Sequence, residues 1–145
     1  MPSHKHEALI ALFREHPELA VNLLDGIPDV EIPAYTAARV TSGDLTDIAP
    51  TEYRADLVIS LTDSDEKSSA LAVIVEVQLR RDVRKRRTWP AYVSTLHARH
   101  GCPVYLLVVC PDPAVATWCA ETIVIGRLTL APVVLGPENT PIVTE

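Results

Sequence analysis

The stretch ADLVISL (55–61), TDSDEKSS (62–69) and ALAVIVEVQL (70–79) decides the fold of this chain. Its outer segments are apolar and rich in β-branched residues, a composition typical of β-strands. The polar segment between them is short, so the simplest connection is an antiparallel hairpin whose turn is centred near residue 66. Facing residues in such a hairpin lie equally far from the turn, which predicts that Asp56 lies opposite Glu76.

The segment 70–79 is apolar on both of its alternating faces. A strand of this kind is usually central in its sheet and covered on both sides, which predicts an α/β fold with helices on both faces of the sheet. Further strands are expected over GDLTDI (43–48), PVYLLVVC (103–110) and 129–135.

Apolar residues at helical spacing predict four helices. The third contains Pro90, so it either begins near Thr88 or is kinked at the proline, and Gly101 is placed to end it. The expected order of elements along the chain is α-α-β-β-β-α-β-α-β. The helices are expected over residues 5–15, 17–24, about 88–100 and 113–120.

The bulk composition fits one domain without a membrane segment. The 145 residues, 48% of them hydrophobic, suffice for a single core, so residues 1–145 are expected to form one domain. No apolar run is long enough for a signal peptide or a membrane span, and the three cysteines lack C-x-x-C spacing. These features predict a cytoplasmic protein with reduced thiols. The net charge of −6 means that a nucleic acid would have to be held by a local basic patch.

Asp56 and Glu76 are two carboxylates that the hairpin would place side by side, with Cα atoms about 5 Å apart. Facing like charges within apolar strands repel each other, and a divalent cation between them removes the conflict. Gln78 projects on the same side as Glu76, and the backbone carbonyl of Val77 offers another oxygen. Mg²⁺ prefers such ligands. The alternative is a solvated strand end, since a one-residue slip in register changes the faces.

The combination of ADLVI (55–59), VIVEVQ (73–78) and RTWPAY (87–92) resembles the recombination-promoting nuclease and transposase-associated branch of the PD-(D/E)XK nuclease superfamily. The opening HEALIALF (6–13) is similar to the helical start of that group. The resemblance covers roughly residues 4–110. It implies a restriction-endonuclease-like core, in which helices flank a mixed central sheet in the order α-β-β-β-α-β.

Carried over to this sequence, the resemblance implies that Asp56, Glu76 and Gln78 are catalytic and that Asp56 and Glu76 bind Mg²⁺ or Mn²⁺. Gln78 stands where relatives commonly have lysine, and glutamine cannot contribute the positive charge that helps to stabilise the transition state. Glu7 stands where relatives often have aspartate, which implies an outer metal ligand. The alternative for Glu7 is a solvated acid, because acids favour the first turn of a helix.

A basic run follows the second strand and holds six of the thirteen Lys and Arg residues. Arg and Lys contacts to phosphate supply most of the non-specific affinity of proteins for nucleic acid. We therefore expect Arg80, Arg84 and Arg87 to bind DNA, although a solvated helix face explains such a run equally simply. The run consists of Arg80, Arg81, Arg84, Lys85, Arg86 and Arg87.

Together these observations predict a Mg²⁺-dependent DNA endonuclease that hydrolyses phosphodiester bonds. Cutting both strands would need two sites, which implies a homodimer. The main alternative is a nuclease-like scaffold with weak or no activity that binds nucleic acid or a protein, and a third is an interaction domain without a nucleic-acid role. The chain has no G-x-S-x-G, P-loop or G-x-G-x-x-G motif, which disfavours serine hydrolases and nucleotide-binding enzymes.

Overall fold

The structure is a computed structural model that describes residues 3–45, 54–62 and 68–138. The chain forms two compact units, residues 1–48 and residues 49–145. None of the helices in the described ranges is long and apolar enough to cross a membrane.

The N-terminal unit contains the two predicted helices, α1 (His4–Glu15) and α2 (Glu18–Asp25). The Ser3 hydroxyl accepts the N–H of His6 at 3.1 Å, which caps the first turn of α1. The strand expected over 43–48 is not formed at residues 43–45, and residues 46–48 lie outside the described ranges. In the described part, Gly43 and Asp44 are residue types that strands disfavour, and the apolar side chain of Leu45 is 71% exposed.

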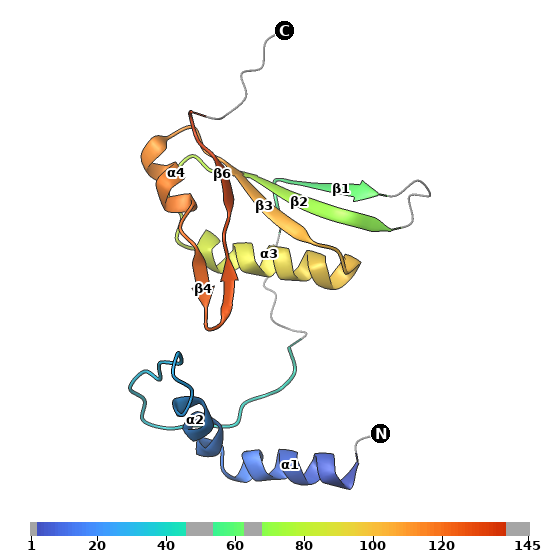
Figure 1. The fold of residues 1–145 in the computed structure, drawn as a ribbon, viewed down its shortest axis with the longest axis vertical. Helices are drawn as coiled ribbons and strands as arrows, with labels where there is room; N and C mark the ends of the chain where they lie inside the picture. Colours follow the sequence, from blue (N-terminus) through green and yellow to red (C-terminus); the bar gives the residue numbers. More distant parts are fainter. Residues whose placement is uncertain (1–2, 46–53, 63–67, 139–145) are drawn as a thin grey trace. The chain divides into compact units, whose positions relative to one another are not determined.

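The C-terminal unit is built on a mixed four-stranded sheet with the order β1-β2-β3-β6 (Figure 1). The first two strands form an antiparallel hairpin, and the next two are added in parallel. The strands are β1 (Leu57–Thr62), β2 (Ser69–Val77), β3 (Val104–Val109) and β6 (Val133–Leu135).

The register of the hairpin agrees with the sequence-based prediction. Leu57 faces Val75 and Ile59 faces Val73. One step beyond the end of the paired strand, the same register places Asp56 opposite Glu76.

Helix α3 (Lys85–His100) connects β2 to β3 and begins before the expected Thr88. Pro90 lies inside the helix and is buried. The helix ends as expected at Gly101, whose φ of 67° is a left-handed conformation that glycine adopts without strain. Its N–H donates to the carbonyl of His97 at 2.7 Å.

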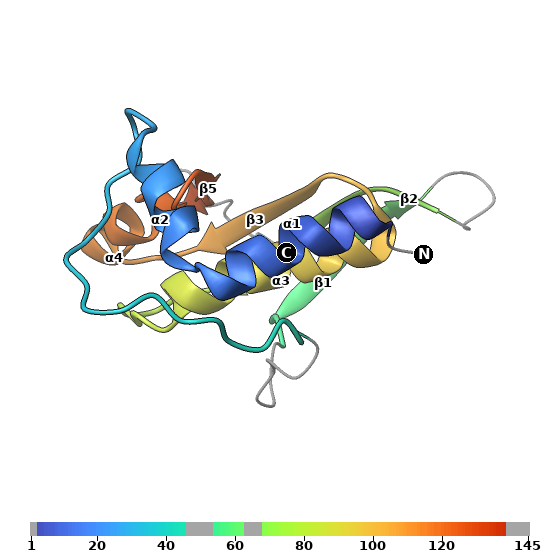
Figure 2. The same ribbon diagram turned by 90° about the horizontal axis from the view of Figure 1, so that it is seen from below.

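The core lies between one face of the sheet and α3, which runs along that face (Figures 1 and 2). Helix α4 (Pro113–Cys119) adds Cys119 to the same core. Within this unit the helices therefore cover one face, and the prediction of helices on both faces is not met here. On the opposite face of the sheet, six side chains are 44–54% exposed: Leu57, Ile59, Leu61, Val77, Tyr105 and Val133.

The last part of the chain differs from the prediction of one strand over 129–135. Gly126, with a φ of 61°, turns the chain so that β5 (Leu128–Leu130) pairs with β4 (Ile123–Ile125) in a separate hairpin. Pro132 has no N–H for a ladder, so the pairing breaks before β6 joins the main sheet.

Candidate functional site

The two predicted carboxylates meet where β1 begins and β2 ends. The backbone N–H of Asp56 donates to Oε2 of Glu76 at 2.8 Å. The backbone N–H of Val77 in turn donates to Oδ2 of Asp56 at 2.9 Å. Each carboxylate is thus held by the strand that carries the other one, and both are fixed at the same end of the hairpin.

Glu76 is a buried carboxylate, with only 1% of its surface exposed. Its Oε1 accepts hydrogen bonds from Nζ of Lys85 and from Nε1 of Trp89, each at 3.1 Å. With the N–H of Asp56, three donors therefore stabilise this anion. Such pairing is what a buried charge requires, because leaving it without partners would cost several kcal/mol.

Lys85 is the functional residue that the sequence analysis did not single out from the basic run. Its side chain is 27% exposed, and its Nζ lies 5.8 Å from the centre of the Tyr92 ring. Burial alone would lower the pKa of Lys85, but the hydrogen bond and the charge of Glu76 raise it above its ordinary value. The ammonium therefore stays positive beside the carboxylate of Glu76.

Gln78 and Val77 lie at the end of β2 as expected. Gln78 is 6% exposed and lies on the same buried face as Glu76. Its Nε2 donates to the carbonyl of Arg80 at 2.7 Å, which fixes the backbone that leaves the strand. The N–H of Val77 points toward Asp56, and the carbonyl of a strand residue points the same way as its N–H. The Val77 carbonyl is therefore directed within the sheet toward the arm of the hairpin that carries Asp56.

The arginines of the basic run have different surroundings. Arg80 and Arg87 are exposed. Arg84 is also exposed but binds Asp82, with Nε 3.2 Å from Oδ1, and this hydrogen bond lowers the pKa of Asp82 and raises that of Arg84. Arg86 has a structural role, because its guanidinium donates to three backbone carbonyls at the end of α4. These belong to Trp118, in the last turn of the helix, and to Glu121 and Thr122, which follow it.

Glu7 lies on α1, in the other compact unit, so its role as an outer metal ligand stays a prediction. Its side chain is 63% exposed and lies 3.7 Å from Nδ1 of His6. In the part of the chain that the structure describes, no group of three or more His, Cys, Asp or Glu side chains is placed to hold a metal ion. A cation held by Asp56 and Glu76 would add the Val77 carbonyl, and water and phosphate oxygens would complete its shell, as is usual for Mg²⁺.

We expect the free energy of unfolding to fall as the pH rises from 9 to 11, because burial raises the pKa of the Cys119 thiol from 9.0 to about 11. The unfolded state therefore loses this proton before the folded state does. Lys85 acts in the same direction. Its raised pKa means that its stabilisation is complete below 10.5 and is lost above that value.

Urea unfolding at a series of pH values measures this loss. The matched control is Cys119→Ala, which should remove the part of the decrease that begins near pH 9. A free energy of unfolding that is constant across this range would contradict the prediction.

No protein-family model, curated protein or solved structure matches this chain. The chemical interpretation therefore depends on the arrangement of Asp56, Glu76 and Lys85.

Proposed function

We propose that this protein is a Mg²⁺-dependent endonuclease that hydrolyses phosphodiester bonds in DNA. The proposal depends on one observation. At the open end of the hairpin, the carboxylates of Asp56 and Glu76 each accept a hydrogen bond from a backbone N–H of the other arm, and Lys85 adds a positive charge beside Glu76. Two carboxylates and a cation at one point are suited to binding a divalent metal and a phosphate together.

The fold is compatible with this proposal. The hairpin β1–β2 is followed by α3 and the parallel strand β3, which corresponds to the last four elements of the α-β-β-β-α-β order. A restriction-endonuclease-like core of the PD-(D/E)XK superfamily is the finer assignment that we propose on this basis.

In the proposed reaction, Asp56, Glu76 and the carbonyl of Val77 would hold Mg²⁺ or Mn²⁺. The ion would supply Lewis-acid activation of water and of the phosphate. Lys85 stabilises the negative charge that develops on the phosphate oxygens, because its ammonium is held beside Glu76 in a partly buried setting. Gln78 orients the attacking water with its remaining amide oxygen while its Nε2 holds the backbone of Arg80.

DNA is held in this proposal by the exposed guanidinium groups of Arg80, Arg84 and Arg87. These side chains follow directly after the strand that carries Glu76, so their charge is concentrated near the reacting phosphate. Cleavage of both strands would use two copies of the site in a homodimer.

A nicking assay on supercoiled plasmid tests the proposal. Purified protein with Mg²⁺ or Mn²⁺ should convert the plasmid to the open-circular form, and chelation of the metal should stop the conversion. Asp56→Ala should abolish nicking, whereas Glu121→Ala, which removes an exposed acid from the same unit, should leave it unchanged. If no DNA form is nicked, or if Asp56→Ala nicks as well as the wild type, the enzymatic proposal is lost.

The second candidate is a binding module without catalysis. It is favoured by the three donors that already satisfy Glu76 without any metal. Calorimetry separates the two candidates, because an enzyme must bind Mg²⁺ at Asp56 and Glu76. Retention of DNA together with an absence of Mg²⁺ binding would favour the binding module.

A further inference from the structure

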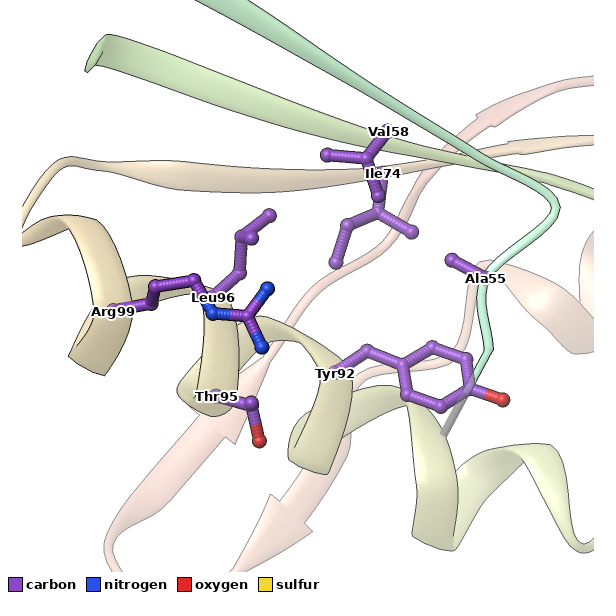
Figure 3. Close-up of a pocket in the computed structure, with 7 residues that line it drawn as sticks. All are labelled: Ala55, Val58, Ile74, Tyr92, Thr95, Leu96 and Arg99. Atoms are coloured by element: carbon purple, nitrogen blue, oxygen red, sulfur yellow. The ribbon is translucent and has the colours of Figure 1, made fainter. Parts of the chain in front are cut away.

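A pocket opens between the hairpin β1–β2 and helix α3 (Figure 3). Its volume is about 100 Å³. Three apolar side chains line one side: Val58 and Ile74 come from the sheet, and Ala55 comes from the segment that precedes β1. The helix contributes Leu96 and three residues with polar ends, Tyr92, Thr95 and Arg99. One wall is therefore apolar, whereas the other carries hydrogen-bonding groups.

The pocket lies directly beside the carboxylate site. Ala55 precedes Asp56 in the chain, and Ile74 lies two residues before Glu76 on the same face of β2. Two residues of a strand span about 7 Å. Tyr92 connects the two regions, since its ring lines the pocket and its centre is 5.8 Å from Nζ of Lys85. When one group of a molecule is bound at the carboxylates, the next group along that molecule can thus enter the pocket.

Arg99 gives the pocket a positive charge. Its guanidinium extends from the helix toward Tyr92 (Figure 3). Its side chain is exposed, and among the described residues no acidic side chain forms a salt bridge with it. An exposed guanidinium without an acidic partner binds phosphate readily, by charge and by directed N–H groups.

We propose that this pocket binds one unpaired pyrimidine nucleotide of a DNA strand, next to the phosphodiester that lies at Asp56 and Glu76. This inference rests on the proposed nuclease function and adds a preference for single-stranded or opened DNA. The ring enters between Val58, Ile74 and Leu96, while Arg99 pairs with the phosphate of the same nucleotide. The pocket lies next to the carboxylates along β2, so the base that enters it belongs to a nucleotide adjacent to the bound phosphodiester.

The size of the pocket determines which base it accepts. A cavity of roughly 150 Å³ encloses a benzene molecule. A pocket of about 100 Å³ is smaller than this and open on one side, so it takes part of one six-membered ring and excludes a base pair, and a purine leaves more of its surface outside the pocket than a pyrimidine does. Because a base in a duplex must leave its stack to enter such a pocket, double-stranded DNA should bind less well than a single strand.

Fluorescence anisotropy with a labelled oligothymidylate tests the proposal on the full-length protein. The buffer contains a chelator, so that binding is measured without cleavage. Val58→Phe fills the pocket and should weaken binding by about tenfold, because the base can then no longer enter it. The matched control is Ile59→Phe, because Ile59 is the next residue of β1, is 44% exposed against 45% for Val58, and faces the other side of the sheet. Its affinity should stay within about twofold of the wild type, since surface changes are usually small.

A second variant does not alter the packing. Arg99→Gln should reduce the dependence of log affinity on log salt by about 0.7, the contribution of one phosphate contact to a single strand. Lys5→Gln, which removes an exposed charge from α1, should leave this slope unchanged. An oligoadenylate and the duplex of the two strands should both bind more weakly than oligothymidylate alone.

The inference is overturned if Val58→Phe and Ile59→Phe bind alike, or if Arg99→Gln keeps the wild-type salt slope. A protein that instead captures apolar peptides through this pocket would show the first of these results. The outcomes are separate from those of the nicking assay. Pocket-dependent binding without nicking would remove the enzymatic proposal alone, and nicking with unchanged binding by Val58→Phe would remove the pocket alone.

Discussion

Replacing Glu76 by alanine is expected to lower the free energy of unfolding of the C-terminal unit by about 3 kcal/mol. The side chain is buried, and its removal leaves three donors without their acceptor, including the ammonium of Lys85 and the indole N–H of Trp89. The ammonium retains some contact with water because the Lys85 side chain is 27% exposed, which places the loss at the lower end for a broken buried ion pair.

Urea unfolding followed by tryptophan fluorescence measures this effect, since both tryptophans of the chain, Trp89 and Trp118, lie in the C-terminal unit. Glu121→Ala removes an exposed acid and should change the free energy of unfolding by less than about 0.5 kcal/mol. A loss below about 1 kcal/mol for Glu76→Ala would mean that the buried ion pair does not stabilise the fold as we infer.

Lys85→Met is expected to destabilise the unit by about 2 kcal/mol, because the buried carboxylate of Glu76 then lacks a counter-charge. The same change should reduce the nicking rate about 10²- to 10³-fold, the usual loss when one group that stabilises transition-state charge is removed. Arg81→Met is the matched control, since Arg81 is an exposed member of the same basic run. Its stability and nicking rate should stay close to those of the wild type.

The double variant Glu76→Gln, Lys85→Met measures the energy of the ion pair apart from the other contributions of the two side chains. Without the negative charge at position 76, removal of the ammonium leaves no uncompensated ion. The double variant should therefore lose less stability than the sum of the losses of Glu76→Gln and Lys85→Met, each measured alone. Additive losses would show that the two groups do not stabilise each other. Reduced nicking by Lys85→Met with normal stability would instead assign the lysine to the reaction alone.

Local patterns predicted most of the secondary structure correctly. The β-branched runs around Ile59 and Ile74 are strands, and Pro113 begins the helix that was expected there. The failures also have local causes. At residues 43–45, glycine and aspartate disfavour a strand and none is formed, and the turn at Gly126 divides the expected last strand.

The sequence by itself determined the pairing of Asp56 with Glu76. In an antiparallel hairpin the register follows from the position of the turn, so two residues on neighbouring strands could be placed from residue numbers alone. Side chains alternate along a strand, so the sequence also placed Gln78 on the same face as Glu76.

The packing of α3 on the sheet, which the sequence pattern does not specify, determines which cation contacts Glu76. Lys85, rather than Arg84 or Arg86, reaches Glu76 because α3 folds back over the buried face of the sheet and turns that side chain inward. Arg86, close to it in the basic run, is directed to the end of α4. The physical reason is that contacts between a helix and a sheet depend on where the packed surfaces meet, and the spacing of residues along the chain does not specify this.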